Sequence, residues 1–163
     1  MAKNKEEKTN VMRVLEQKKI AYTAHTYPHE EGMAVDGVTV AKSMGFDPAI
    51  VFKTLVARGA SKQYYVFDVP VAENLDLKKA AKAVGEKSIE MIHQKELLPL
   101  TGYVHGGCSP VGMKKLFPTV FHSSAENLET MIVSAGKIGY QVELAPHDLA
   151  ALVRAKFADI IVE

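Results

Sequence analysis

Two short runs of apolar and β-branched residues, 51–58 and 63–69, constrain the fold most strongly. Each run is long enough for one strand, and only the four residues Gly59-Ala60-Ser61-Lys62 separate them. Two such runs joined by a short polar loop with a glycine predict a β-hairpin. The chain therefore contains at least one antiparallel pair of strands, and the first of them presents its side chains to alternating faces.

The rest of the chain mixes helical and extended patterns without the regular spacing of βαβ units. The apolar spacing predicts helices over 5–19, 35–44, 75–84, 94–98 and 146–153, the fourth ending before Pro99 and the fifth being the terminal element. Further strands are predicted over 21–27, 88–92, 119–122, 130–134 and 140–144. We expect one domain, residues 4–163, of the α+β class: a mixed, largely antiparallel, barrel-like sheet surrounded by helices.

The balance of charges limits what the chain can bind alone. Lys and Arg number 20 against 19 Asp and Glu, a formal net charge of +1. Proteins that hold nucleic acid through its phosphates usually carry a clear basic excess. A nucleic acid would therefore need a local basic patch or the help of a second protein. The basic residues that could form such a patch, or simply a solvated surface, are Lys78, Lys79, Lys82, Lys87, Lys114 and Lys115.

Membrane insertion and export leave no sign in the sequence. No apolar run is long enough to span a bilayer, and the first ten residues, MAKNKEEKTN, lack the apolar centre of a signal peptide. Cys108 is the only cysteine, so no disulfide can form within the chain. We expect a cytoplasmic protein with no membrane partner.

Lys53 is the first candidate for a chemical role. It stands in the run Val51-Phe52-Lys53-Thr54-Leu55, where alternation places it on the same face as Val51 and Leu55. A lysine on an apolar face either extends its ammonium group to water along its aliphatic stem or serves a site. In a site it can hold a phosphate or carboxylate, or polarise a carbonyl. The pattern leaves both interpretations open.

The tract 103–118, YVHGGCSPVGMKKLFP, is a second candidate because it holds three glycines and a Ser-Pro step. Glycines let the backbone approach a ligand closely, so that free N–H and C=O groups recognise it. The segment Gly106–Pro110 is either such a loop or an ordinary tight turn, and it matches no standard nucleotide-binding motif. Within it, Cys108 is either a thiolate nucleophile near His105 or a small buried apolar residue.

Metal and triad chemistry receive no support from the spacing of residues. Six histidines are present, but no two stand four apart on a predicted helix, and a single cysteine adds little. The G-x-S-x-G motif of many serine hydrolases is also absent. We therefore predict no metal site and no cofactor.

An ordered set of short segments covers nearly the whole chain and resembles the YbaK/EbsC family, specifically its YbaK-type Cys-tRNA(Pro) deacylases. Each segment alone is weak evidence, whereas the set in this order is specific. The segments include His25-Thr26-Tyr27, Phe52-Lys53-Thr54-Leu55, Leu75–Ala83, Thr101-Gly102-Tyr103, Gly106–Gly112, Val133–Lys137 and Ala155–Ile160.

The resemblance implies a fold shared with the editing domain of many bacterial prolyl-tRNA synthetases. It also implies trans-editing, the release of cysteine from mischarged tRNA(Pro) and less selectively from other tRNAs such as tRNA(Cys). In the implied reaction the substrate's own thiol attacks its ester and forms a thiolactone, so the protein supplies no nucleophile, metal or triad. The implied partners are the 3′-aminoacyl-adenosine end of the tRNA and prolyl-tRNA synthetase, which would supply the affinity that a near-neutral domain lacks.

The resemblance also assigns residues. Lys53 matches the essential lysine of the family, and Gly106 matches a glycine whose carbonyl faces the substrate, so both are predicted to be catalytic. Two departures bear on the preferred amino acid: Gln141 stands where some members have an aspartate, and Cys108 where the loop often has an aliphatic residue. The predicted substrate-binding residues are Tyr27, Thr54, Gly107, Ser109, Pro110 and Ser134.

Other functions remain open at this point. One is the deacylation of Ala-tRNA(Pro) or another aminoacyl-tRNA by water. Another is a non-catalytic, regulatory module that binds tRNA or a synthetase. A third is thiol-dependent chemistry on Cys108, which predicts that Cys108→Ala abolishes activity.

Overall fold

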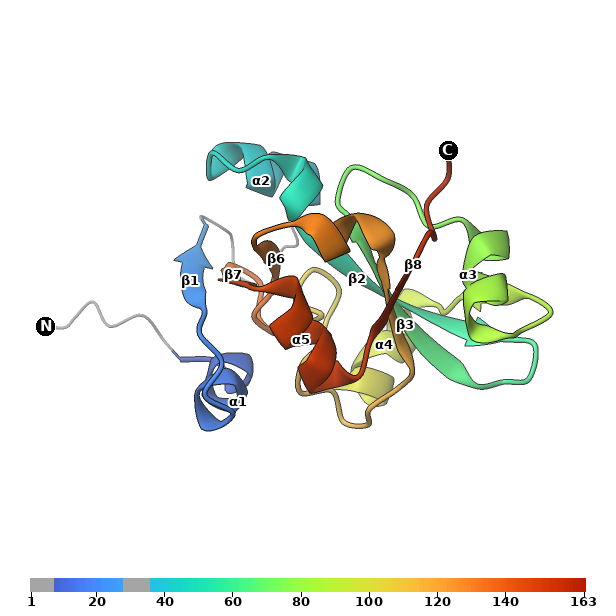
Figure 1. Cartoon of the computed structure of the whole chain (residues 1–163). Coiled ribbons are helices and arrows are strands. Elements are labelled where there is room, and N and C mark those ends of the chain that lie inside the picture. Colours follow the sequence, from blue (N-terminus) through green and yellow to red (C-terminus); the bar gives the residue numbers. More distant parts are fainter. Residues whose placement is uncertain (1–7, 28–35) are drawn as a thin grey trace, which may run out of the picture.

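The structure, a computed structural model, describes residues 8–27 and 36–163, and these carry all the elements named below (Figure 1). The helices are α1 (Asn10–Gln17), α2 (Gly37–Ser43), α3 (Leu77–Val84), α4 (Gln94–Thr101) and α5 (Pro146–Val153), with short 3-10 turns η1 (Pro48–Ile50) and η2 (Ser123–Asn127). The strands are β1 (Thr23–Thr26), β2 (Phe52–Gly59), β3 (Tyr64–Pro70), β4 (Ile89–Met91), β5 (Thr119–His122), β6 (Met131–Ser134), β7 (Tyr140–Leu144) and β8 (Lys156–Ala158).

The strands form two sheets, with the orders β4-β2-β3-β5-β8 and β1-β7-β6. The predicted hairpin is present: β2 and β3 pair antiparallel, from Phe52 opposite Pro70 to Arg58 opposite Tyr64. β5 joins β3 in parallel, and β8 joins β5 in parallel, so the larger sheet is mixed while the smaller one is antiparallel. The predicted α+β class is confirmed, although the strands of the described residues do not close into one barrel.

The two sheets meet along the first half of β2. On its second edge, β2 pairs with β4 only over Ala57–Gly59. Nearer its start, the same edge of β2 faces β6. One isolated parallel bridge joins Val51, just before β2, to Ile132 of β6. An unpaired stretch of strand between two sheets leaves room for a cavity, and the residues around Lys53 lie there.

The two faces of the hairpin pack on different cores. Phe52 and Val56 face the larger core, which receives Leu15 of α1 and Leu149 of α5. The opposite face packs under α3, where Phe67 of β3 is fully buried. Each fully buried large apolar side chain contributes roughly 1.5–3 kcal/mol, so this double burial fixes the face that every residue of β2 presents.

Polar caps set the starts of two helices, α3 and the α2 helix that borders the cavity. Asp76 accepts hydrogen bonds from the backbone N–H groups of Lys78 and Lys79, so the helix predicted from residue 75 begins at Leu77. Asp36 caps α2 in the same way, through the N–H of Thr39 at 3.1 Å. Residues 5–7 and 35, which the first two predicted helices included, lie outside the described residues.

Two predictions about the helices are wrong. α4 runs through Pro99 to Thr101. The helix has few backbone bonds for a proline to remove, and both of its ends are secured, by Glu96 accepting from the His93 N–H and by the Gly102 N–H donating to Leu98. α5 is not the terminal element, because β8 follows it. β8 pairs in parallel with a strand far away in sequence, a contact that three residues of local pattern do not reveal.

No helix in the described parts of the chain is long and apolar enough to cross a membrane.

Candidate active site

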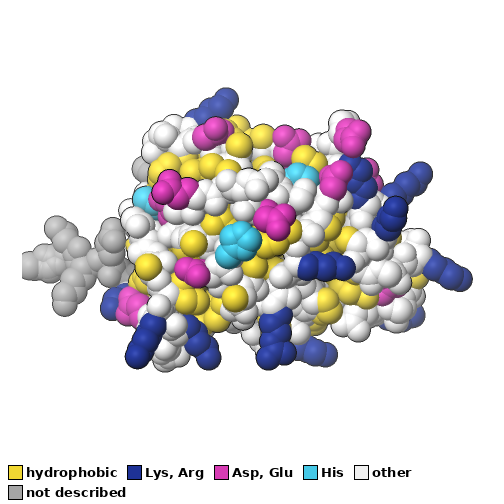
Figure 2. All heavy atoms as spheres, in the orientation of Figure 1, with side chains coloured by type: hydrophobic (Ala, Val, Ile, Leu, Met, Phe, Trp, Pro, Cys, Tyr) yellow, Lys and Arg dark blue, Asp and Glu magenta, His cyan; other side chains and the backbone are white. Residues whose placement is uncertain are grey.

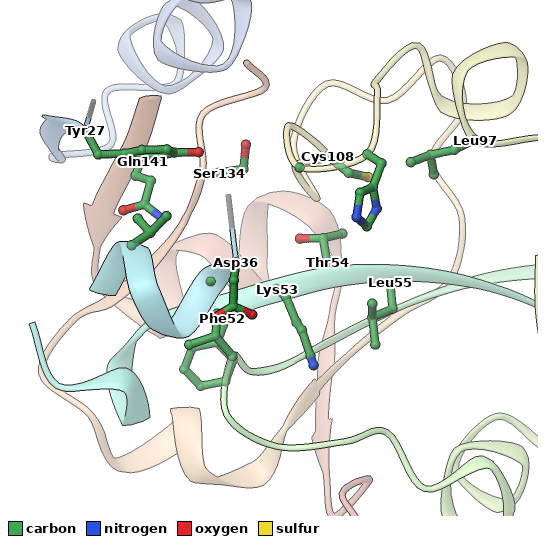
Figure 3. A pocket seen from close by; sticks show the side chains of 15 residues that line it. Tyr27, Asp36, Phe52, Lys53, Thr54, Leu55, Leu97, Cys108, Ser134 and Gln141 are labelled. Carbon is green, nitrogen blue, oxygen red and sulfur yellow. The ribbon is translucent and has the colours of Figure 1, made fainter. Parts of the chain in front are cut away.

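A cavity of about 330 Å³ opens between the two sheets (Figure 3). Its wall combines the end of β1, the start of α2, the first half of β2, α4, the glycine-rich loop before β5, the end of β6 and the middle of β7. The residues that line it are Tyr27, Asp36, Gly37, Val40, Phe52, Lys53, Thr54, Leu55, Val71, Leu97, His105, Gly106, Cys108, Ser134 and Gln141.

Lys53 lies on the face of β2 that alternation predicts, with Leu55. Its side chain is half-buried, and burial lowers the pKa of its ammonium group, while the more distant charges of Asp36 and Glu73 act in the opposite direction. Among residues 8–27 and 36–163, no carboxylate forms an ion pair with Lys53. The ammonium group is thus partly removed from water, and no carboxylate in contact with it neutralises its charge. These are the properties expected of a group that binds the oxygen atoms of a ligand.

Thr54 leaves β2 on the side opposite to Lys53 (Figure 3). Its hydroxyl donates a hydrogen bond of 2.5 Å to Oδ1 of Asp68, which stands directly opposite on β3. Asp68 is 0% exposed, and this burial raises the pKa of its carboxyl to about 7, although the bond from Thr54 lowers it in part. Behind the cavity wall there is therefore a buried carboxyl that sequence reasoning did not identify.

The glycine-rich loop reaches the cavity through Gly106. This residue has φ of 90°, a left-handed conformation that favours glycine over any residue with a side chain. By contrast, Gly107, Ser109 and Pro110 are buried and do not line the cavity: a Cβ on Gly107 would lie 3.1 Å from the Ile138 nitrogen, and Ser109 accepts from the Val111 N–H. They hold the loop in place, and their direct contact with substrate stays a prediction.

Polar residues of the smaller sheet form another part of the wall. Tyr27 is buried at the end of β1. Gln141, in the middle strand β7, stands between His25 and Ser134 in the register. Its side-chain oxygen Oε1 is buried and has no hydrogen-bond partner in the described structure. The structure therefore brings together five of the predicted residues around one cavity: Tyr27, Lys53, Thr54, Gly106 and Ser134.

Cys108 lines the cavity but does not have the properties of a nucleophile. Only 7% of it is exposed, and burial, with a contribution from the charge of Asp68, raises the pKa of its thiol to about 12. A thiol with that pKa is protonated at neutral pH, whereas catalytic cysteines are thiolates. In the residues that the structure describes, no cluster of three His, Cys, Asp or Glu side chains suits a metal ion.

Sequence reasoning missed several lining residues because their role depends on tertiary contacts. Gly37 is one: a Cβ there would lie 2.7 Å from Cγ1 of Val71, so only glycine lets the start of α2 approach this wall. Asp36 is another, and its signal was local, since an aspartate before a helix predicts a cap. Nothing in the sequence pattern indicated that this cap lies near Lys53.

The basic residues do not gather into one patch on the face that Figure 2 shows. Lys79 is already engaged, with its Nζ 3.0 Å from Asp159, 3.0 Å from the Ile161 carbonyl and 3.2 Å from Glu163. Lys78, Lys82 and Lys87 are exposed. Figure 2 shows lysine and arginine side chains spread along the edges of one face rather than gathered at one place. Lys79 therefore has a structural role, whereas the exposed Lys78, Lys82 and Lys87 fit the interpretation as a solvated surface.

Comparison with known proteins identifies the family of the chain. The model of the aminoacyl-tRNA editing domain family matches residues 29–152. EbsC of Enterococcus faecalis, a candidate Cys-tRNA(Pro)/Cys-tRNA(Cys) deacylase, is 45% identical over 161 residues, which cover 98% of each chain. The chain belongs to the aminoacyl-tRNA editing domain family. The predicted family, and with it an enzyme of the aminoacyl-tRNA deacylase class, is confirmed.

Solved structures agree on the fold. A candidate trans-editing enzyme for prolyl-tRNA synthetase superposes with a TM-score of 0.78 at 24% identity, covering 94% of this chain and 95% of its own. A hypothetical protein superposes with a TM-score of 0.82 at 18% identity, covering 93% and 99% of the two chains. At such identities the likeness concerns the fold, and it confirms the arrangement of helices and sheets that encloses the cavity.

Proposed function

We propose that this protein is a trans-editing deacylase that releases cysteine from mischarged Cys-tRNA(Pro), and also from Cys-tRNA(Cys). The observation that carries the proposal is a cavity whose wall unites Lys53, Thr54, Gly106, Tyr27 and Ser134. The volume of about 330 Å³ is at the small end of ligand pockets, which suits an aminoacyl group and part of its ribose. We take residues 4–163 as one such editing domain, acting in the cytoplasm.

The proposed reaction needs no nucleophile from the protein. The sulfur of the substrate's side chain attacks the carbonyl carbon of its own ester; a C–S bond forms, the C–O bond to the terminal ribose breaks, and the thiol proton ends on the ribose oxygen. The products are free tRNA and a cyclic cysteine thiolactone. Because the attack is intramolecular, the protein accelerates it by holding the chain bent. The protonated state of Cys108 supports this proposal, since no other thiol is present in the chain.

Lys53 has the central role in this scheme. Negative charge develops on the ester oxygen as sulfur attacks, and a positioned cation stabilises that charge most strongly where water is partly excluded. The ammonium group of Lys53 is half-buried and forms no ion pair within the described residues, so it is free to do this. It also has the reach to anchor the phosphate of the terminal nucleotide.

The other wall residues orient the substrate. The left-handed backbone of Gly106 places its peptide groups at the cavity, where the carbonyl is proposed to hold the substrate amine. Oε1 of Gln141 is a second acceptor without a partner in the described structure. Selection of cysteine over proline by size alone would be weak, because one methylene is worth only about 1–3 kcal/mol. Selection by the substrate's own thiol avoids that limit.

A partner is proposed to deliver the tRNA. With a net charge of +1, the chain has little general attraction for phosphates. Prolyl-tRNA synthetase, which holds tRNA(Pro) after charging it, would supply that affinity. This predicts that addition of the synthetase lowers the Cys-tRNA(Pro) concentration needed for half-maximal cleavage without changing the rate at saturation.

The test is the loss of three esters, Cys-tRNA(Pro), Ala-tRNA(Pro) and Pro-tRNA(Pro), in the presence of the purified protein. We expect fast loss of the cysteinyl ester alone, and Cys108→Ala is expected to retain it. Loss of the alanyl ester instead would indicate attack by water and contradict the thiol mechanism. If no ester is lost, with or without the synthetase, the protein is a binding module and the proposal is wrong.

A further inference from the structure

Asp68 is a buried ionisable group to which the proposed reaction gives no role. It stands opposite Thr54 in the register of β2 and β3, is 0% exposed, and accepts the Thr54 hydroxyl hydrogen at 2.5 Å. Its second oxygen, Oδ2, has no partner in the described structure. An incompletely paired buried carboxyl lowers stability. Its place directly behind a cavity residue indicates a functional reason for keeping it.

We propose that Asp68 is a positioning residue that determines whether Thr54 offers the cavity a hydrogen-bond acceptor or a donor. The proposal rests on the proposed deacylase function of this cavity. When Asp68 is ionised, it takes the hydroxyl hydrogen of Thr54, and the lone pairs of Oγ1 are left for the cavity. When Asp68 is protonated, its own O–H donates to Oγ1, and the Thr54 hydrogen turns toward the cavity. Protonation of Asp68 thus changes Thr54 from a hydrogen-bond acceptor to a hydrogen-bond donor toward the cavity.

The surroundings of Asp68 place this change in a usable pH range. From β2 it meets Thr54, from β5 it is opposite Phe121, and from the glycine-rich loop Cys108 interacts with it. Burial raises the pKa of the Asp68 carboxyl to about 7. The thiol of Cys108 has its pKa raised to about 12 and is therefore neutral in this range.

Lys53 and His105 also line the cavity, and neither is a cause of the pKa shift at Asp68. Lys53 leaves β2 on the side opposite to Thr54 (Figure 3), and His105 is an exposed residue of the loop. Among the residues that the structure describes, no charged group contributes to the pKa shift of Asp68, which follows from burial and from the bond with Thr54. The protonation state of Asp68 therefore depends on the pH and on the hydrogen bond from Thr54, and not on a neighbouring charge.

The acceptor state is the productive one for a cysteinyl ester. The α-ammonium group of the substrate carries only hydrogen-bond donors, so it needs an acceptor on the wall. With Asp68 ionised, Thr54 provides one, and the negative charge behind it strengthens the contact. With Asp68 protonated, Thr54 presents a hydrogen to the ammonium group, and positioning is lost. Activity that depends on Asp68 should therefore rise as the pH passes through about 7.

The experiment compares single-turnover cleavage of Cys-tRNA(Pro) by the wild-type protein and by Asp68→Asn from pH 5.5 to 8.5. The ratio of the two rates cancels the titration of the substrate's thiol and amine, and uncatalysed hydrolysis is subtracted. We expect the ratio to rise from near 1 to about tenfold, the effect of exchanging a charged partner for a neutral one. The exposed carboxylate Asp148 provides the control, Asp148→Asn, with a flat ratio.

Action through Thr54 is tested in a second background. In Thr54→Val, which has no hydroxyl, Asp68→Asn should change the rate less than twofold and the pH-dependent ratio should disappear, whereas Thr54→Ser should preserve it. An equal effect of Asp68→Asn in both backgrounds, or a flat ratio in the wild type, overturns the proposal.

A readout without substrate separates this proposal from the proposed function. The carboxyl carbon of Asp68, followed by NMR, should titrate near pH 7, and Thr54→Val should move its midpoint upward because the bond from Thr54 favours the ionised form. If the wild type cleaves no cysteinyl ester, the proposed function is wrong, and this titration alone decides about Asp68. An unmoved midpoint in Thr54→Val overturns the coupling.

Discussion

Two lysines, in two regions of the molecule, differ in whether the structure neutralises their charge. Lys79 of α3 contacts Asp159, Glu163 and the Ile161 carbonyl near the C-terminal end of the chain, and the carboxylates of Asp159 and Glu163 raise the pKa of its ammonium group. At the cavity, burial lowers the pKa of Lys53, which forms no ion pair in the described structure. Lys79 thus joins α3 to the C-terminal end of the chain, whereas the charge of Lys53 is not neutralised by any contact in the described structure.

The carboxylates repeat this contrast. Glu86 holds the tip of the hairpin by accepting from the Ser61 hydroxyl and N–H and from the Tyr65 hydroxyl, and these bonds lower the pKa of its carboxyl. Asp68 has one partner and a raised pKa. Glu86, at the periphery, is satisfied within the chain, whereas Oδ2 of Asp68 and Oε1 of Gln141, in and behind the cavity wall, have no hydrogen-bond partner in the described structure. We expect a ligand to complete these groups at the cavity.

The largest expected effect is that of Lys53→Ala on cleavage. Removal of a cation that stabilises developing negative charge should slow single-turnover cleavage of Cys-tRNA(Pro) by about 10²–10³-fold. The fold should be retained, since Lys53 forms no ion pair in the described structure that the change would break. Thermal unfolding is the measurement that shows this. Turnover within threefold of wild type would show that the contrast between the two lysines has no functional meaning.

The second effect concerns stability and pH at Asp68. Its pKa in the folded protein, about 7, lies above its ordinary value of 3.8, so its stabilising contribution is complete below pH 3.8 and is lost as the pH rises through 7. Relative to Asp68→Asn, the wild type should lose about 4 kcal/mol of unfolding free energy between pH 4 and pH 8. Urea unfolding at several pH values measures this difference.

The matched variant for that measurement is Glu86→Gln. Because its pKa is lowered, Glu86 stabilises the fold at neutral pH and loses this contribution as the pH falls. The two variants should therefore deviate from the wild type in opposite directions. Parallel curves would contradict the distinction between satisfied and unsatisfied carboxylates.

A smaller effect is expected from Gly106→Ala. A side chain at φ of 90° strains the backbone by roughly 1–2 kcal/mol, and the loop will relax by moving its carbonyl away from the cavity. We expect a moderate loss of stability and a loss of cleavage of about tenfold or more. Gly45→Ala is the control, because Gly45 has φ of 77°, a Cβ added there would meet no atom within 4 Å, and the residue lies outside the cavity wall. Equal rates for the two variants would remove Gly106 from the site.

The smallest effect on cleavage is that of Lys79→Ala. The contacts of Lys79 join α3 to the end of the chain, so their loss should lower the melting temperature and leave the cleavage rate within twofold of wild type. Added salt should reduce the difference in melting temperature, because exposed ion pairs are screened. A large loss of activity in Lys79→Ala would contradict the structural role that its contacts indicate.

Local signals were sufficient to predict much of this architecture. The hairpin, α5 with both of its bounds and the face of β2 that carries Lys53 all follow from alternation, turn residues and prolines within short windows. β8 and the course of α4 through Pro99 did not follow, because each depends on contacts with segments remote in sequence. The open arrangement of two sheets likewise results from the short pairing of β4 with β2.

The site divides in the same way. Lys53 and Gly106 have signals of their own, a charge in an apolar run and a glycine pair in a loop, and the family resemblance gave them roles. Asp68 has no such signal, because an aspartate within a predicted strand does not reveal which face it occupies or how completely it is covered. Only the pairing of β2 with β3 places its carboxyl against the Thr54 hydroxyl.

The most direct test of the central claim is the binding of cysteinyl-adenosine in which a stable amide replaces the ester. Binding is followed by NMR with the wild type, Lys53→Ala and Lys79→Ala. We predict that the backbone signals of Thr54, Gly106 and Ser134 shift on binding, that Lys53→Ala weakens it at least tenfold, and that Lys79→Ala leaves it unchanged. Shifts confined to another surface, or equal affinity in all three proteins, would contradict the assignment of this cavity as the editing site.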